Sequence, residues 1–119
     1  MAPEAILADR PVDGRADLYS LACSAYWAVT GQLVFPTTSP TQMLLHHVQT
    51  IPTRPSEVSE IPIPKALDTL LMQCLEKDPA KRPASALALE SQLDCIRCPE
   101  AWTEARARAW WMTHAPEVA

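Results

Sequence analysis

An uncharged stretch in the first half of the chain most constrains its fold. No Asp, Glu, Lys or Arg occurs from Leu18 to Thr53. Within it, the apolar residues of segment 16–30 do not keep to one stripe but cover the whole circumference of a 3.6-residue helix. A helix that is apolar on every side belongs in the interior of a larger body. The sequence therefore predicts a central helix, buried on nearly all sides against later segments or against chain outside these 119 residues.

Both ends of this helix carry the expected signals. Asp13 and Asp17 are two possible capping carboxylates, placed where the free backbone donors and the positive end of the helix dipole favour negative charge. Gly31 follows the last apolar residues and is the usual residue for a left-handed C-terminal turn.

The rest of the chain predicts four further helices, so the expected fold class is all-α with about five helices. The prolines in 1–14 and 50–64 predict extended, turn or irregular segments there. The third helix has the clearest amphipathic pattern. The expected helices and their inward residues are a second from Pro40 or Thr41 with Met43, Leu44, His47 and Val48; a third from Pro64 to Lys77 with Leu67, Leu70, Leu71, Cys74 and Leu75; a fourth opened by Pro83 and Ser85 and closed by Cys98-Pro99, with Ala86, Leu89, Leu93 and Ile96; and a short fifth over 102–114, capped by Thr103.

Composition excludes some classes of partner. The net charge is −4 and the basic residues form no block, which argues against a nucleic-acid partner. No run of about 20 apolar residues would span a membrane. The N-terminus has no basic segment followed by an apolar run, as a secretory signal would. With two of the four cysteines expected on apolar helix faces, a reducing, cytoplasmic location is predicted.

Two residue pairs raise the question of a metal or catalytic site. Cys95 and Cys98 have the spacing of half a zinc site or of a redox pair, but no second Cys or His pair lies at usable spacing. His46 and His47 have no accompanying carboxylate or nucleophile. The sequence therefore predicts no metal site and no catalytic role for these residues.

Four motifs, in order, resemble the C-terminal part of a protein kinase catalytic domain of the serine/threonine type found in bacteria as well as eukaryotes. The last matches almost letter for letter, whereas Ala22 stands where the family most often has Gly, and Val34 replaces its Pro. The resemblance implies a partial kinase domain over 1–97, without the N-lobe and catalytic loop, and a tail over 98–119 with a short Trp-rich helix. The four motifs are Met-Ala-Pro-Glu at 1–4, Asp-Leu-Tyr-Ser-Leu-Ala at 17–22, Thr-Gly-Gln-Leu-Val-Phe at 30–35 and Cys-Leu-Glu-Lys-Asp-Pro-Ala-Lys-Arg-Pro at 74–83.

The resemblance also implies structural roles for three residues. The Glu matching Glu4 pairs with the Arg matching Arg82, which ties the end of the activation segment to a loop between two later helices. The Asp matching Asp17 accepts backbone hydrogen bonds from the catalytic loop. Two simpler structural interpretations stay open. In one, Glu4 and Arg82 form an ordinary surface pair worth about 0 to 1 kcal/mol. In the other, Asp17 only caps its helix.

The parts that bind and transfer phosphate are not found in the sequence. Phosphoryl transfer needs a glycine-rich loop, a lysine on the phosphates, a catalytic aspartate and metal ligands, yet the chain has only Gly14 and Gly31 and no His-Arg-Asp or Asp-Phe-Gly. By family order these parts lie upstream of Met1. We therefore expect no catalytic, cofactor-binding or metal-binding residue in this chain. Mg-ATP belongs to the parent kinase, which would phosphorylate protein hydroxyls. A truncated gene, a mis-assigned start and a retained remnant would each explain this.

The expected partners are the missing N-terminal kinase segment and a protein substrate or regulator. Met43, Leu44 and His47 lie on the helix that in kinases helps to receive proteins, although core packing explains them equally well. The Trp-rich tail either packs on its own lobe, which we expect, or links to a further domain. Two alternative functions stay open, a non-catalytic protein-interaction module derived from a kinase C-lobe and an unrelated small helical bundle.

Overall fold

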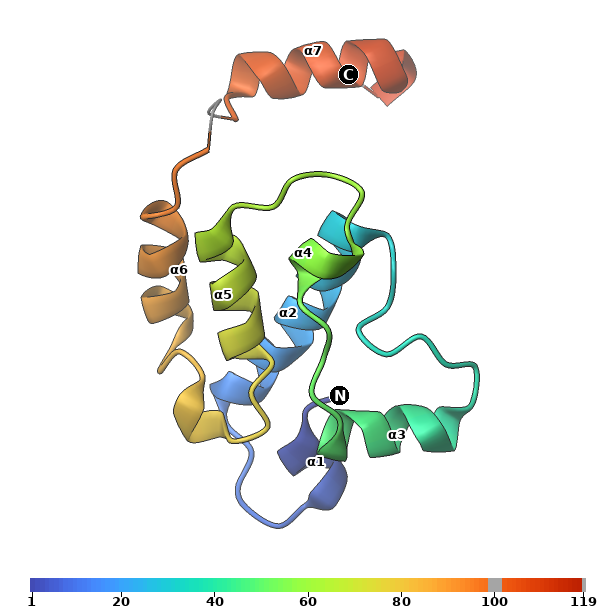
Figure 1. Ribbon diagram of the computed structural model, residues 1–119. Helices are drawn as coiled ribbons and strands as arrows, with labels where there is room; N and C mark the ends of the chain where they lie inside the picture. The colour runs from blue at the N-terminus through green and yellow to red at the C-terminus, as the bar shows by residue number, and fades with distance from the viewer. Residues whose placement is uncertain (99–101, 119) are drawn as a thin grey trace.

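The computed structural model describes residues 1–98 and 102–118, and this part of the chain is helical without a strand (Figure 1). The prediction of an all-α chain is therefore confirmed for the described residues. The helices are α1 Pro3–Leu7, α2 Gly14–Thr30, α3 Pro40–Gln49, α4 Pro55–Val58, α5 Lys65–Cys74, α6 Ala86–Asp94 and α7 Glu104–His114, with 3-10 turns at Pro79–Lys81 and Pro116–Val118.

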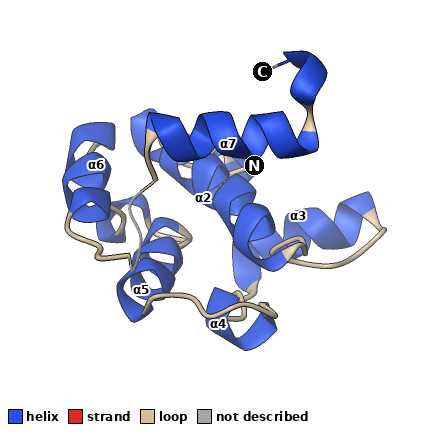
Figure 2. Cartoon of the chain, turned by 90° about the horizontal axis from the view of Figure 1, so that it is seen from above, coloured by secondary structure: helices blue, strands red, loops and turns tan. Residues whose placement is uncertain are grey.

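Helix α2 lies at the centre of the molecule. Helices α4, α5 and α6 pack against it, and α1 packs against α3 (Figures 1 and 2). Burying these faces together removes apolar surface of α2 and α5 from water, which is the main stabilising contribution in a body of this size. The buried core consists of Ala2, Ala16, Leu18, Tyr19, Ala22, Tyr26, Val34, Phe35, Leu70, Leu71, Cys74, Leu75 and Leu89.

The helix ends follow from local chemistry. The Asp13 carboxylate accepts a hydrogen bond from the Arg15 backbone N–H at 2.9 Å, so Asp13 is the N-cap of α2. Gly31 ends the helix at φ 73°, a conformation that a side chain with Cβ rarely adopts. Ser39, Ser85 and Thr103 cap α3, α6 and α7 in the same manner as Asp13.

Within the described residues, one face of α2 is uncovered, so these segments alone do not bury the helix on nearly all sides as predicted. Leu21 and Trp27 are 55% and 58% exposed. They belong to a continuous line of exposed residues, because positions three or four apart share one face of a helix, while α4, α5 and α6 pack against the other face. We call this line the α2 stripe; it consists of Asp17, Ser20, Leu21, Ser24, Trp27 and Ala28.

Two segments predicted to be non-helical contain short helices. Pro3 begins α1 inside segment 1–14, and Pro55 begins α4 inside segment 50–64. Proline is tolerated in the first helical turn because the N–H that it lacks would have no helical partner there. These prolines therefore mark helix starts, which the sequence analysis missed.

The predicted third and fourth helices both form, but only the third buries the face that was predicted to point inward. Helix α5 buries Leu70, Leu71 and Cys74 as expected. Helix α6 buries only Leu89 and ends at Asp94, whereas Leu93 is 43% exposed. The predicted inward position of Ala86 is also wrong, and Ile96 is only partly buried. The Pro99 stop signal lies outside the described residues.

The tail forms the expected helix but does not pack on the lobe. Figure 1 shows α7 standing apart from the other helices, and Trp102, Trp110 and Trp111 are 45% to 65% exposed. Their ring contacts are with neighbours in the tail, since Trp110 stacks on His114 at a centroid distance of 4.3 Å. The prediction that these tryptophans pack on their own lobe is therefore wrong.

Ending the chain at Cys98 is expected to change the free energy of unfolding of the helical body by less than about 0.5 kcal/mol, as for changes away from packed surfaces. The reason is the exposure of all three tail tryptophans. Urea unfolding of the full and shortened chains, followed by circular dichroism at low protein concentration, measures the difference. A loss above about 1 kcal/mol would show that the tail stabilises the body in solution.

Candidate functional site

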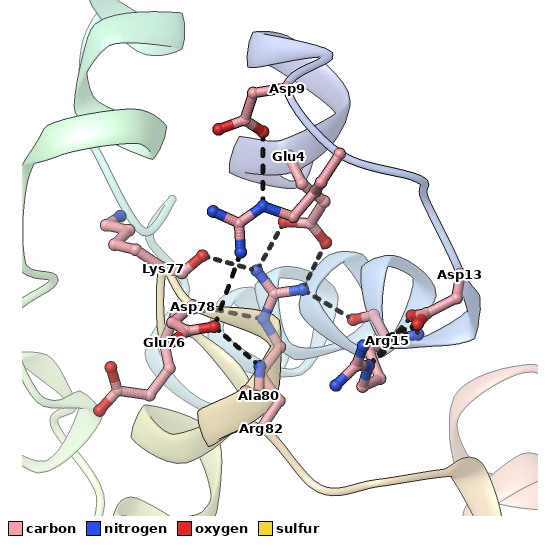
Figure 3. A network of polar contacts seen from close by, with 10 residues as sticks. Glu4, Asp9, Asp13, Arg15, Glu76, Lys77, Asp78, Ala80 and Arg82 are labelled. Carbon is pink, nitrogen blue, oxygen red and sulfur yellow. Dashed lines mark hydrogen bonds and ion pairs between the residues drawn. The ribbon is translucent and has the colours of Figure 1, made fainter.

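A buried ion pair joins the first helix to the loop after α5. The Arg82 Nη1 atom lies 2.6 Å from Oε1 of Glu4, and Nη2 lies 2.9 Å from Oε2 (Figure 3). Glu4 is only 3% exposed and Arg82 only 4%. This two-bond pairing of a planar guanidinium with a carboxylate is the strong, geometrically specific form of such a contact. The hydrogen bonds from Arg82 hold the pKa of Glu4 below its usual value although burial opposes this.

Arg82 also donates hydrogen bonds to backbone carbonyl oxygens. Nε donates to the Glu76 oxygen at 2.8 Å, and the two Nη atoms donate to the oxygens of Arg15 at 3.0 Å and Lys77 at 3.3 Å. The guanidinium also lies over the Tyr19 ring, 4.9 Å from its centroid. Arg82 therefore fastens together α1, the start of α2 and the loop after α5, with every nitrogen of its charged group satisfied.

The loop that carries Arg82 is shaped by local sequence. The Asp78 carboxylate accepts a hydrogen bond from the Ala80 N–H at 3.0 Å, and Pro79 begins the 3-10 turn. Capping by Asp and a fixed proline φ both favour such a turn. The turn ends at Arg82, which enters the body in an extended conformation.

Asp17 lies in the first turn of α2 and points to the surface. It is not the N-cap, because that role belongs to Asp13. A surface hollow of about 420 Å³ lies beside it, lined by residues 13–15, 17–18 and 84–86. Asp17 is thus placed with its carboxylate open to an incoming group at the beginning of the α2 stripe, and nothing in the described structure tests the role that the resemblance implies.

A second polar cluster, which sequence reasoning did not find, lies beneath α3. The Tyr19 hydroxyl and His47 Nδ1 are 2.7 Å apart, and both side chains are buried. The Phe35 ring packs edge-on against His47, and Lys77 Nζ lies 4.9 Å from the Phe35 centroid while donating to the His46 carbonyl oxygen at 3.3 Å. Aromatic residues in the uncharged stretch were the available signal, but pairing across 28 positions is not visible in a sequence.

Burial shifts the proton affinities in this second cluster. It lowers the pKa of His47 to about 4 and that of Lys77 to about 8, and it raises the pKa of the Tyr19 hydroxyl. Each shift disfavours the charged form, as expected when water is removed around an ionisable group. The Tyr19–His47 contact is therefore a hydrogen bond between neutral groups at pH 7.

The three residues considered for protein docking do not share one surface. His47 is buried against Tyr19, Met43 is partly buried against the core, and only Leu44 is more than 40% exposed. The His47 ring is buried and forms an internal hydrogen bond with Tyr19, so it is not part of any docking surface in this structure.

A further buried carboxylate fastens the 50–64 connection to α5. Asp68 accepts hydrogen bonds from the Ser56 backbone N–H at 3.0 Å, the Ser56 hydroxyl at 3.0 Å and Arg54 at 3.2 Å. Burial alone would raise the pKa of Asp68, but these hydrogen bonds outweigh burial and lower it. Tyr26 adds a bond from α2 to the Thr53 carbonyl oxygen at 2.8 Å. The proline-rich connection is therefore held in one place despite its irregular backbone.

Replacing Asp68 with Ala is expected to cost about 2 to 3 kcal/mol of stability, because three part-buried hydrogen bonds from Ser56 and Arg54 to a charged acceptor are lost. Replacing the exposed Glu60 in the same connection with Ala is the matched control and is expected to stay within about 0.5 kcal/mol. Urea unfolding measures both variants. Equal effects for the two would contradict a stabilising role for Asp68.

The described residues contain no cluster of three or more His, Cys, Asp or Glu side chains that could hold a metal ion. Cys95 and Cys98 are free and exposed. Among the helices described, none combines the length and the apolar character that crossing a membrane requires.

The fold and the buried pair together define the class of structure. It is a helical lobe built around α2, in which the Glu4–Arg82 ion pair joins the segment before α2 to the loop after α5. The sequence matches the protein kinase domain family over residues 1–93, and the chain therefore belongs to this family. It is similar to the serine/threonine-protein kinase PksC of Streptomyces coelicolor, with 39% identity over 97 residues and 82% of this chain.

Two other bacterial relatives match the same region. The serine/threonine-protein kinase Pkn1 of Myxococcus xanthus is 40% identical over 93 residues, and PknB of Mycobacterium tuberculosis is 33% identical over 93 residues, each over 78% of this chain. The matched regions make up only 17%, 13% and 14% of the lengths of PksC, Pkn1 and PknB. The chain thus corresponds to about a sixth or less of each of these relatives.

Proposed function

We propose that residues 1–97 are the lower helical part of the larger lobe of a serine/threonine protein kinase, followed by a tail over 98–119. The observation that carries this proposal is the buried Glu4–Arg82 pair. Its two residues lie 78 positions apart in the sequence, in the first and last motifs of the kinase resemblance. An unrelated helical bundle would have no reason to bury the same two residues against each other.

The parent reaction would be the transfer of phosphate from Mg-ATP to serine or threonine hydroxyls of proteins. The groups that bind the nucleotide and the metal lie upstream in the family order, so this chain would contribute the foundation on which they rest. Asp17 would accept backbone hydrogen bonds from the catalytic loop, and the α2 stripe would be covered by the upstream segment of the lobe. The exposed Leu21 and Trp27 support this role, since apolar surface of that kind favours burial.

A Mg-ATP titration of the 119-residue chain, followed by calorimetry, tests the proposal. We expect no binding and no phosphate transfer to a general protein substrate. The matched arm is the chain extended through the coding sequence before Met1, where a glycine-rich loop, His-Arg-Asp and Asp-Phe-Gly are expected. Phosphotransfer by the extended chain, reduced by Asp17→Asn, would support the proposal. Nucleotide binding by the 119 residues alone would contradict it.

The second candidate is a non-catalytic protein-interaction module derived from the same lobe, and the exposed α2 stripe favours it as well. The two candidates differ in behaviour at high concentration. A lobe that lacks its cover is expected to self-associate through Leu21 and Trp27, whereas a module is expected to stay monomeric until its protein partner is added. Sedimentation of the chain and of a Leu21→Ser/Trp27→Ser variant separates these outcomes.

Several other features follow from the kinase assignment. Mg-ATP would be a cofactor of the parent enzyme only, its protein partners would be substrates or regulators, and the expected location is the cytoplasm. On α3, the exposed Leu44 and its exposed neighbour Leu45 would be the residues to test for protein docking in the longer chain.

A further inference from the structure

The four cysteines fall into a buried group and an exposed group. Cys74 is buried in the core and Cys23 is partly buried against it. Burial raises the pKa of both thiols, that of Cys74 to about 11. Cys95 and Cys98 are exposed instead. Since the thiolate is the reactive form and must be reached by its reagent, the exposed pair is the chain's accessible dithiol.

The backbone around this pair allows the two sulfurs to meet. Cys95 is the C-cap of α6, and residues 96–98 belong to no helix or strand. Three residues of extended chain span at most about 10 Å, and a disulfide needs Cα atoms about 4.4 to 6.8 Å apart. A turn at Ile96 and Arg97 therefore suffices, and it requires no hydrogen bond inside α6 to break.

We propose that Cys95 and Cys98 form a reversible disulfide by exchange with small peptide disulfides of the glutathione type. A thiolate of the pair attacks the small disulfide, whose S–S bond breaks and releases one small thiolate, leaving a mixed disulfide. The second thiolate attacks the protein sulfur of that bond and releases the other half. The protein dithiol loses two electrons and two protons, and the small disulfide takes them up as two thiols.

The surroundings of Cys95 suit a small peptide disulfide. Cys95 lines a groove of about 440 Å³ between α5 and α6, together with Lys65, Gln73 and Gln92. An ammonium and two side-chain amides can hold carboxylate and peptide groups of the incoming molecule by hydrogen bonds. The Lys65 charge also favours an anionic reagent in this groove.

The disulfide would act on the junction between the helical body and the tail. The closed ring contains Ile96 and Arg97, so its formation restricts the backbone angles just after α6. The oxidation state of the pair would thereby set the direction in which the chain leaves the lobe. This inference does not depend on the proposed kinase function, because it rests on the exposed thiols, their position after α6 and the groove beside Cys95.

The test treats the reduced 119-residue chain with glutathione disulfide and then analyses it by alkylation under denaturing conditions and mass spectrometry. We expect two of the four thiols to disappear, with no glutathione retained and a disulfide linking Cys95 to Cys98. Cys95→Ser and Cys98→Ser are each expected to keep one bound glutathione. Both positions are exposed, so folding should be unchanged, which circular dichroism checks.

Trypsin provides a second readout, because the bond after Arg97 lies inside the ring. We expect cleavage at Arg97 to be several-fold slower in the oxidised than in the reduced chain, and the Cys98→Ser variant to show no such protection. A wild-type chain that retains glutathione, forms mainly disulfide-linked dimers, or keeps all four thiols would overturn the proposal. Equal cleavage of the oxidised and reduced chains would overturn its effect on the junction.

Discussion

Replacing Arg82 with Met destabilises the fold by an expected 3 to 5 kcal/mol, roughly the cost of leaving one member of a buried ion pair without its partner. Glu4 is 3% exposed and receives two hydrogen bonds from Arg82. The carbonyl oxygens of Arg15, Glu76 and Lys77 lose a donor at the same time. Urea unfolding at low protein concentration measures the change.

The control is Arg10→Met, since Arg10 pairs with Asp78 at 3.7 Å on the surface and is 49% exposed. Such a pair is worth about 0 to 1 kcal/mol. A Glu4→Leu/Arg82→Met double variant tests the cause, because removing both charges relieves the unpaired carboxylate. It is expected to be more stable than Arg82→Met alone. If Arg82→Met costs no more than Arg10→Met, the pair does not stabilise the fold.

Acidification is expected to destabilise the chain in two separate ranges of pH, and His47 accounts for the first. Its pKa is about 4 in the fold against 6.5 in its ordinary state, so below pH 6.5 the unfolded chain binds a proton that the folded chain does not. Stability supplied by the neutral ring is therefore complete above pH 6.5 and falls as the pH is lowered towards 4. Between pH 7 and pH 4.5 the expected loss is about 2 to 3 kcal/mol.

The groups around His47 identify the variants to compare. The Tyr19 hydroxyl bonds its Nδ1 atom, and the positive charges of Lys77, His46 and the N-terminus also disfavour protonation. His47→Gln is expected to flatten the dependence of the unfolding free energy on pH between 4.5 and 6.5, whatever its own cost. His46→Gln is the matched neighbour and should leave most of the slope. An unchanged slope in His47→Gln would contradict the assignment.

The second pH range of destabilisation lies lower, and the protonation of buried carboxylates causes it. The pKa values of Glu4 and Asp68 are lowered from 4.5 and 3.8, so the stability they supply is present above those values and is lost as the pH falls below them. Measurements between pH 4.5 and 6.5 therefore report on His47 with little contribution from Glu4 or Asp68.

Local sequence signals were sufficient for much of the fold. Capping residues and Gly31 placed the helix ends, and the spacing of Leu70, Leu71 and Cys74 gave the buried face of α5 correctly. These signals work because hydrogen bonds at helix ends and helical periodicity involve residues only a few positions apart. Pro3 and Pro55 were misjudged because proline both interrupts helices and begins them.

The contacts of the candidate site also divide into those that the sequence indicated and those that it did not. The kinase motifs indicated that Glu4 and Arg82 belong together, and the structure places them in contact. The contacts of Tyr19 with His47 and of Asp68 with Ser56 carried no signal, because each joins segments that the chain brings together only on folding.

The sequence by itself determined the family, the helical class and the positions of most helix ends, because motifs and local hydrogen bonds are written in neighbouring residues. Only the tertiary structure decided which face of α2 is covered and which charges are buried. An apolar residue such as Trp27 favours burial equally at every position, but whether it is buried depends on distant segments lying over it, and the segments described here pack on the opposite face.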